Sequence, residues 1–177
     1  SSGPPERGPT KPGHQGRDAM ATAVVSSRGL VGIAAPTVTV EVHLSGGLPS
    51  FQLVGLPEAA VREARVRVRS AIQNSRFEFP MSRIAVNLAP ADLPKDGTRF
   101  DLAIAIGILA ASGQVPAAAI AGAEFLAELA LTGELRPVPG ILAATVAARE
   151  AGAALFVHPG SAPEAGLVED ARVFQIG

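Results

Sequence analysis

The stretch RIAVNLAPADLPKDGTRFDLAIAIGILAAS, residues 83–112, predicts a strand, a loop and a helix in that order. Residues 83–88 form a short apolar run that is typical of a buried strand. Residues 102–112 are apolar all round, which predicts a helix packed on several sides. Asp101 stands where the N-cap of this helix would stand. The end of the connection, PKDGTRFD at residues 94–101, looks like an active-site loop.

The segments on either side mix strand and helix patterns. Upstream, we expect strands at residues 21–28, 36–44 and 50–56, the first two antiparallel, and a helix over 58–74. Downstream, we expect a strand at 125–132 that continues at 135–138 after a tight turn at 133–134. A helix over 141–151, ended by Gly152, should follow. We then expect strands at 154–157 and 171–176, with a helical turn near 163–168 between them. Because strands and helices do not alternate strictly, the predicted fold class is α/β or an α+β sandwich, with a mixed sheet and packed helices.

The composition of the chain limits the class of protein to which it can belong. The 177 residues include no Cys, Trp or Tyr, are 47% hydrophobic and carry a net charge of −1, as expected for one globular domain with a tail. Residues 1–19 are mostly Gly, Pro and charged, so we expect a disordered extension or an expression tag before a domain at 20–177. The longest nearly apolar run, 102–111, is too short to span a membrane, and no signal peptide is visible. We therefore expect a cytoplasmic protein with no membrane partner.

Common catalytic and metal-binding motifs are missing from the sequence. No Gly-Lys pair occurs, so the chain has no P-loop for nucleotide phosphates. The zinc spacing H-E-x-x-H and the nucleophile elbow G-x-S-x-G are also absent. His43 lies on an expected strand and is predicted to point outward. The sequence therefore predicts no catalytic, metal-binding or nucleotide-binding residues of these types.

A series of motifs resembles one known family. These motifs are VGLP at 54–57, AVRE at 60–63, FEFP at 77–80, NLAPADLPKDG at 87–97, FDL at 100–102, IGILA at 106–110 and GELRPVPG at 133–140. In this order they resemble the N-terminal domain of the ComM/YifB family, often labelled Mg chelatase-like or ChlI. The resemblance runs from about Met20 to the end of the chain.

The resemblance implies a fold and a cellular role. The fold would be Lon-protease-domain-like, in the group of ribosomal protein S5 domain 2. Family members are AAA+ ATPases, and the competence-associated ones are hexameric DNA helicases that drive branch migration in natural transformation. The AAA+ module, which takes ATP and magnesium as cofactors, would lie outside this chain. Partners of this domain would be its own AAA+ module, further copies in a hexamer, and DNA.

The implied relationship to Lon also addresses whether PKDGTRFD reacts. In Lon-like proteases a serine lies two positions past the glycine of a P-K-D-G loop, and an activating lysine lies in a later segment. Here these positions hold Arg99 and Leu142, which cannot act as nucleophile and base. Thr98 with Lys95 is a substitute pair, but an exposed loop lysine is not expected to have the depressed pKa that a base needs. A peptidase or a peptide-binding pseudo-peptidase remains the alternative function.

The loop can instead be structural or make contacts. We expect Pro94 and Gly97 to shape a turn, Lys95 and Asp96 to be solvated, and Asp101 to cap the helix. Arg99, with its planar five-donor group, is a candidate contact for phosphate or for a neighbouring subunit's carboxylate, and Lys95 is a weaker one.

The predicted helix over 58–74 carries a second candidate surface. Arg62, Arg65 and Arg69 share one side at spacings i, i+3 and i+7, a basic ridge about 10 Å long that could contact DNA phosphates. The alternative is a solvated face, because the net charge is not basic and no aromatic residue lies among the arginines for base stacking. The function that the resemblance implies is therefore a non-catalytic accessory domain of a DNA-processing AAA+ ATPase.

Overall fold

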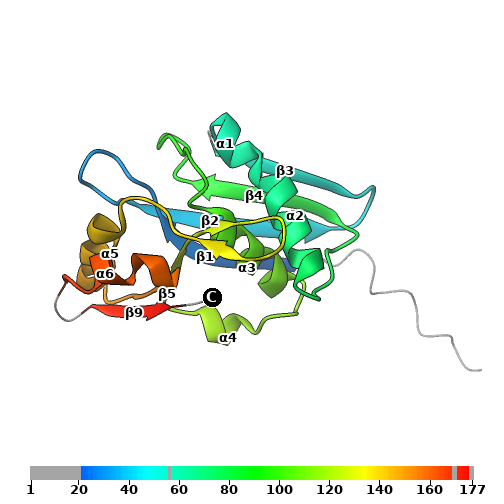
Figure 1. The fold of residues 1–177 in the computed structure, drawn as a ribbon. Helices are drawn as coiled ribbons and strands as arrows, with labels where there is room; N and C mark the ends of the chain where they lie inside the picture. Colours follow the sequence, from blue (N-terminus) through cyan, green and yellow to red (C-terminus); the bar gives the residue numbers. More distant parts are fainter. Residues whose placement is uncertain (1–20, 56, 169–170, 176–177) are drawn as a thin grey trace, which may run out of the picture.

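One seven-stranded sheet runs through the molecule (Figure 1). The computed structural model describes residues 21–55, 57–168 and 171–175, so the predicted extension at 1–19 lies outside the described residues. The strand order is β3-β4-β2-β1-β5-β8-β9, with both parallel and antiparallel neighbours. The sheet is therefore mixed, and helices pack on it, which confirms the mixed α/β class.

The first half of the sheet is close to the sequence-based expectation. It contains β1 (Ala21–Arg28), β2 (Thr37–Ser45), β3 (Ser50–Val54) and β4 (Arg83–Ala89). β2 is antiparallel to β1 and to β4, which confirms the predicted β1–β2 pairing, whereas β3 runs parallel to β4 at the edge. The alternation in β2 is also confirmed, because its apolar residues are buried on one face and His43 is exposed on the other.

Helices cover one face of these four strands. The predicted helix over 58–74 is two helices, α1 (Ala59–Arg62) and α2 (Ala64–Asn74). The break has a local cause: the carbonyl of Ala60 accepts a hydrogen bond from Nη2 of Arg67 at 2.9 Å, where an unbroken helix would use the amide of Ala64. α3 (Asp101–Ala111) confirms the predicted apolar helix and packs against β1 and β2.

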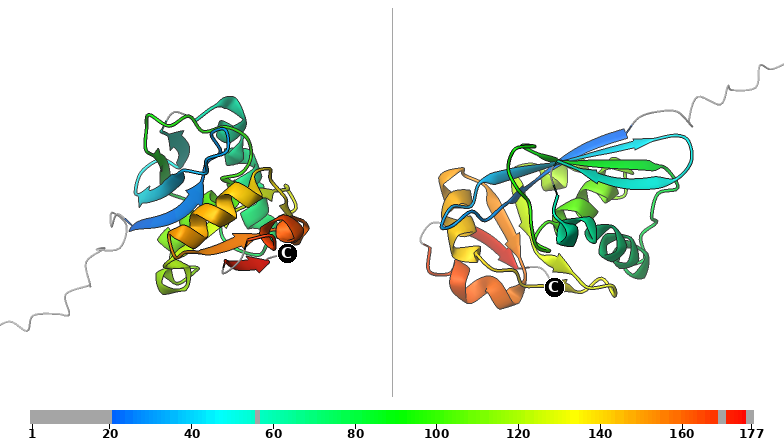
Figure 2. Two further views of the ribbon diagram at one scale, coloured as in Figure 1. Left: turned by 90° about the vertical axis from the view of Figure 1, so that its left-hand side faces the viewer. Right: turned by 90° about the horizontal axis from the view of Figure 1, so that it is seen from above.

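The second half of the sheet holds β5 (Ala123–Leu126), β8 (Ala154–Val157) and β9 (Arg172–Gln175), all parallel (Figure 2). α5 (Ile141–Glu150), the 3-10 turn η1 (Pro159–Ser161) and α6 (Ala162–Ala165) accompany these strands. The predicted cap at the end of α5 is confirmed, since Gly152 has φ +69° and donates its amide hydrogen to Arg149.

Two predictions in this half need correction. The single strand expected at 125–132 is wrong: β5 ends at Leu126, and β6 (Glu128–Leu129) pairs with β7 (Leu135–Arg136) in a separate two-stranded sheet. The chain leaves the large sheet there, because the carbonyl of Ala127 accepts the amide of Leu102 at the start of α3. The short helix α4 (Ala117–Ile120) was not predicted.

The core consists of two clusters of buried apolar side chains. The larger lies between the first strands and helices α2 and α3, and the smaller lies beneath α5. The opposite face of β1, β2 and β4 is open, with Val24 61% exposed. Within the described part of the chain, no helix is both long and apolar enough to cross a bilayer.

Candidate nucleic-acid interface and the 94–101 loop

The loop at 94–101, which looks like an active-site loop in the sequence, connects β4 to α3, and its lysine is buried. Lys95 is 1% exposed, and its Nζ donates to the carbonyl oxygens of Gly55, at 2.5 Å, and of Pro90. The expectation that Lys95 is solvated is therefore wrong. Its own carbonyl accepts the amide of Glu58 at 2.9 Å, which ties the loop to the segment before α1. Burial lowers the pKa of Lys95 because the charged form loses its hydration.

Arg99, the predicted contact residue, also points inward and is 4% exposed. Its Nε donates to the carbonyl of Arg28 at 2.8 Å, and its Nη1 donates to the carbonyl of Pro139 at 3.0 Å. Its Nη2 is buried and has no hydrogen-bond partner among the described residues. Desolvation lowers the pKa of this guanidinium. Arg99 therefore joins the loop to the end of β1 and to the segment before α5.

Asp101 does not cap α3. Phe100 occupies the N-cap position, and Asp101 is the first helical residue, with 1% exposure. Its carboxylate accepts two hydrogen bonds from Arg67, at 2.6 Å to Nε and 3.0 Å to Nη2, and one from the amide of Leu129 at 3.1 Å. The cap prediction fails because the carboxylate joins α2, α3 and β6 instead. Burial raises the pKa of Asp101, against the opposing effect of Arg67.

The remaining loop residues lie near the surface. Pro94, Asp96 and Gly97 are exposed, and Gly97 has φ +73°, in agreement with the predicted turn. Within the described ranges, no hydrogen bond joins Lys95 to the Thr98 hydroxyl, because Lys95 is engaged by backbone carbonyls. The residues that the structure describes also contain no group of three or more His, Cys, Asp or Glu that could hold a metal ion.

The arginine surface is present and exposed. Arg62 ends α1, while Arg65 and Arg69 lie one turn apart on α2. Arg65 donates through Nε to the carbonyl of Arg62 at 3.2 Å and through Nη1 to that of Phe51 at 3.5 Å. The guanidinium of Arg69 lies over the ring of Phe79, 5.3 Å from its centroid, in a cation–π arrangement.

The aromatic residues of this surface were missed by sequence reasoning. Phe79 comes from the segment after α2 and Phe51 from β3, and their ring centroids lie 5.7 Å apart. They reach the arginines only because β3 pairs with β4 beside α2. The motif FEFP marked this segment as distinctive, but no local spacing places it against Arg69.

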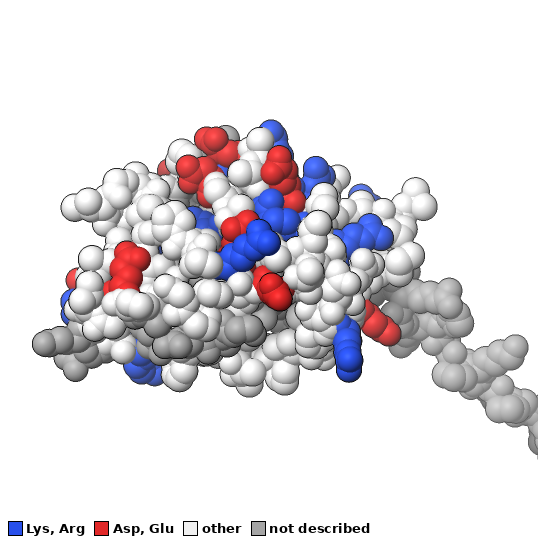
Figure 3. All heavy atoms as spheres, viewed as in Figure 1, with Lys and Arg blue, Asp and Glu red and all other residues white. Residues whose placement is uncertain are grey.

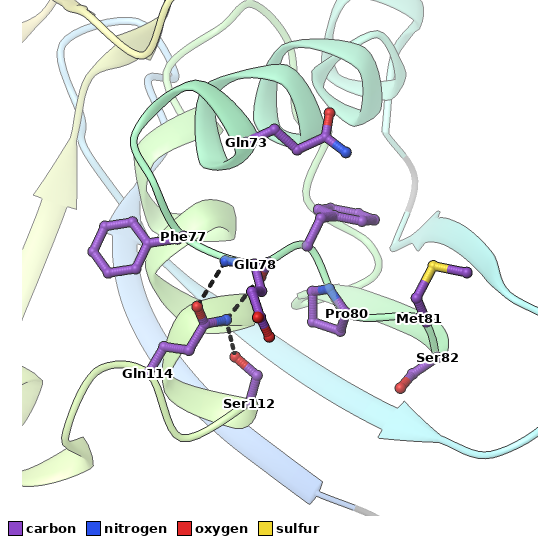
Figure 4. Close-up of a pocket in the computed structure, with 9 residues that line it drawn as sticks. Gln73, Phe77, Glu78, Pro80, Met81, Ser82, Ser112 and Gln114 are labelled. Carbon is purple, nitrogen blue, oxygen red and sulfur yellow. Dashed lines mark hydrogen bonds between the residues drawn. The ribbon is translucent and has the colours of Figure 1, made fainter.

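Two adjoining hollows, which share Gln73, shape this surface. The first, about 420 Å³, is lined by Phe51, Arg65, Val66, Arg69, Ser70 and Gln73. The second, about 620 Å³, is lined by Gln73, Ser112, Gln114 and the segment 77–82 (Figure 4). Gln114 fixes that segment by accepting from the amide of Glu78 at 2.9 Å and donating to its carbonyl at 2.8 Å. We call the two hollows together the arginine–aromatic groove.

The groove is locally basic but not surrounded by basic residues. Figure 3 shows acidic and basic side chains interspersed on the face that carries α1 and α2. Glu63 is one such neighbour, with its carboxylate 3.9 Å from Arg67. Any anion bound in the groove would therefore depend on Arg65 and Arg69 themselves rather than on a broad positive field.

Comparisons with known proteins show the family of the chain. The family model described as "Subunit ChlI of Mg-chelatase" matches residues 40–162. The chain is 56% identical over 155 residues to "Competence protein ComM" of Haemophilus influenzae. The aligned region covers 88% of this chain and 30% of that protein. It is 50% identical to "Uncharacterized protein YifB" of Salmonella typhimurium, over 88% of this chain and 31% of that protein. The chain thus spans about 30% of the length of these curated relatives. By the family match and these relatives, the chain belongs to the Mg-chelatase subunit ChlI family, as a region shared with ComM and YifB proteins.

Proposed function

We propose that this chain is a non-catalytic accessory domain of a DNA-processing AAA+ ATPase, and that it contacts single-stranded DNA through the arginine–aromatic groove. The observation that carries the proposal is the Arg69 guanidinium over Phe79. Arg65 and Phe51 line the same hollow as Arg69, and Phe79 lines the adjoining one. The similarity to a competence protein supports DNA as the partner.

The groove offers the two kinds of contact that single strands use. Arginine side chains can neutralise phosphates, and aromatic rings can stack on unpaired bases. Arg65 and Arg69 lie about 6 Å apart along α2, since four residues of helix rise 1.5 Å each. Phe77, 41% exposed at the second hollow, adds an open aromatic side chain next to Gln73. A duplex would not present its base faces to these rings, so we expect the groove to favour single strands or forks.

The remaining features of the proposal follow the family resemblance. We infer that the fold belongs to the Lon-protease-domain-like group, and that the AAA+ module lies in the part of the relatives that this chain does not span. ATP and magnesium would act in that module, in a cytoplasmic hexamer. Peptidase activity is disfavoured, because Arg99 and Leu142 replace the required dyad and Lys95 is engaged by carbonyls.

The test is a binding titration with fluorescein-labelled single-stranded, forked and duplex DNA over a series of salt concentrations. We expect Arg65→Ala/Arg69→Ala to weaken single-strand binding by about tenfold or more and to reduce the salt slope by about 1.4, for two lost phosphate contacts. Phe79→Ala should weaken binding by about 1–3 kcal/mol through lost stacking.

The matched control removes the same charge elsewhere. Arg136→Ala/Arg149→Ala deletes two exposed arginines outside the groove and should leave affinity nearly unchanged. If both double variants weaken binding equally, the groove is not the site. If the unmodified chain does not bind single strands at low salt, DNA contact by this domain is ruled out.

A further inference from the structure

A separate hollow lies beside the 94–101 loop and shares no residue with the arginine–aromatic groove. It has a volume of about 280 Å³ and is lined by Leu30, Asp96, Gly97, Thr98, Arg99 and Pro139. A Cβ built on Gly97 would meet nothing within 4 Å, so the wall there is bare, accessible backbone. We call this hollow the Arg99 pocket.

The arginine in this pocket lacks the counter-ion that Arg28 and Arg67 have. Arg28, which is buried, pairs with Glu124 at 2.5 Å, and Arg67, which is partly buried, pairs with Asp101 at 2.6 Å. Arg99 is as buried as Arg28, yet among the described residues no carboxylate lies within ion-pair distance of it. A buried charge without a partner is unfavourable, so an oxyanion that paired with Arg99 would offset this cost.

The hydrogen-bonding capacity of Arg99 is also unfilled. A guanidinium has five N–H donors. One on Nε is taken by the carbonyl of Arg28 and one on Nη1 by that of Pro139, while Nη2 has no partner in the described part of the chain. Three donors on two neighbouring nitrogens are therefore left, which is the fork that matches two oxygens of one planar group.

We propose that the Arg99 pocket binds a carboxylate group, held by the Arg99 guanidinium and the Thr98 hydroxyl. Nη2 is closed off from solvent in the structure, so a carboxylate can bind this atom only if the guanidinium turns toward the pocket. The apolar walls from Leu30 and Pro139 accommodate the carbon chain that carries the carboxylate. The group belongs either to a small carboxylic acid or to an Asp or Glu side chain of a protein partner.

The acidic residue at the rim removes the advantage that a doubly charged anion would have in this pocket. Asp96 is exposed and lines the same pocket, so it repels an incoming anion in proportion to the charge of that anion. A dianionic phosphate is attracted about twice as strongly by Arg99 as a monoanionic carboxylate, but it is also repelled about twice as strongly by Asp96. With the charges offset in this way, the planar fork of Arg99 favours an oxyanion with a planar pair of oxygens.

The test is an NMR titration of the ¹⁵N-labelled chain at fixed ionic strength with acetate, glutarate, phosphate, chloride and neutral acetamide. We expect saturable shifts at the amides of Leu30, Gly97 and Thr98 and at Nε of Arg99 with the carboxylates, and weaker ones with phosphate. A Glu-rich peptide and its Gln-substituted counterpart distinguish the two sources. Binding of the Glu peptide at least about tenfold tighter than glutarate assigns a protein partner, and equal binding assigns a small acid.

Two variants make the proposal falsifiable even if one fails to fold. Arg99→Lys keeps the charge but not the fork and should weaken carboxylate binding about tenfold. Asp96→Asn changes an exposed residue and should tighten phosphate binding about three- to tenfold, more than carboxylate binding. Asp92→Asn, an exposed acid of the same loop outside the pocket, is the control and should change neither. Equal shifts with acetamide, no saturation, or equal effects of the two Asn variants would overturn the proposal.

Discussion

At the scale of single residues, Lys95 is the most unusual side chain of the molecule. Its ammonium group is buried against two backbone carbonyls, with no carboxylate bonded to it in the described residues. Carbonyl dipoles replace only part of the lost hydration, so the neutral amine is relatively favoured in the folded state. The pKa of Lys95 is lowered for this reason. The folded chain should therefore become more stable once this lysine is deprotonated.

The first prediction concerns stability at alkaline pH. Between the lowered folded pKa of Lys95 and the ordinary lysine value, the unfolded chain binds more protons than the folded one, so the free energy of unfolding should rise with pH. The chain has no Cys or Tyr, so few other groups titrate from pH 9 to 10.5. Urea denaturation followed by circular dichroism should show this rise, and Lys95→Met should make the curve flat.

Lys11, the other lysine of the chain, provides the control. It lies outside the described residues, and Lys11→Met should keep the rise with pH. A wild-type curve that is flat, or that falls, between pH 9 and 10.5 would contradict the account given for Lys95.

The sequence predicted where this loop lies but not what its charged residues do. The position of the loop follows from the strand and helix patterns on either side of it, and the turn at Gly97 follows from the conformational preference of glycine. Lys95 bonds one backbone carbonyl 5 residues away and one 40 residues away, and both carbonyl partners of Arg99 lie 40 or more residues away along the chain. Such acceptors exist at every position, so they leave no signal in the sequence. Asp101 was misread for the same reason, since its partner Arg67 lies 34 residues away.

At the scale of elements, the approach of α3 to the sheet depends on one glycine. A Cβ built on Gly107 would lie 2.6 Å from Cγ2 of Val42, closer than real side-chain contacts. Val42 is fully buried and β-branched, so it has little freedom to move aside. Gly107 therefore sets the distance between α3 and β2.

The second prediction tests this close approach. In an unconstrained helix, Gly→Ala would stabilise by about 1 kcal/mol. Here we expect Gly107→Ala to destabilise the fold by about 1–3 kcal/mol, because overpacking outweighs helix propensity. The measurement is the urea midpoint at neutral pH.

A double variant separates overpacking from other effects. Val42→Ala removes the clashing methyl groups, so Gly107→Ala should be much less harmful in that background, with a coupling of about 1 kcal/mol or more. Additive effects of the two substitutions would mean that the contact between Gly107 and Val42 does not limit the packing of α3.

Whether a segment forms a helix or a strand was predicted better than the residues at which it begins and ends. The strong periodicities of β2 and α3 fix their type locally, and the structure confirms both. The break between α1 and α2 and the early end of β5 depend on competing donors: the Arg67 side chain takes the Ala60 carbonyl, and the amide of Leu102 takes that of Ala127. A helix or strand pattern in the sequence contains no information about such competing donors.

At the scale of the whole molecule, the two halves of the sheet meet where β1 runs parallel to β5, with Ser26 paired to Glu124. Ala123 and Phe125 of β5 pack in the larger core cluster, whereas Leu126 packs in the smaller one. The buried ion pair between Arg28 and Glu124 lies here, with side chains 7% and 5% exposed. The hydroxyl of Ser27 adds one bond to the carbonyl of Phe125 at 2.7 Å. The two halves are therefore joined by buried polar contacts as well as by shared apolar packing.

The third prediction concerns the ion pair at this junction. Glu124→Gln keeps the shape of the side chain but leaves Arg28 buried without a counter-ion, so we expect a loss of about 3 kcal/mol in the free energy of unfolding. Replacing both residues, as in Arg28→Met/Glu124→Leu, should be less destabilising than Glu124→Gln alone, because no unpaired charge is left. The surface pair offers the control: Glu63 is 72% exposed, so Glu63→Gln should change stability by about 0.5 kcal/mol or less.

Hydrogen exchange tells whether the junction couples the halves or merely contributes to overall stability. In Glu124→Gln, the amides of β8 and α5 should exchange much faster, whereas those of β2 and β4, which lie on the far side of β1 from β5, should change less. This difference is expected because opening the β1–β5 contact frees the second half without dismantling the first. An equal loss of protection in all strands would instead mean that the sheet unfolds as one cooperative unit, with the ion pair acting only on its total stability.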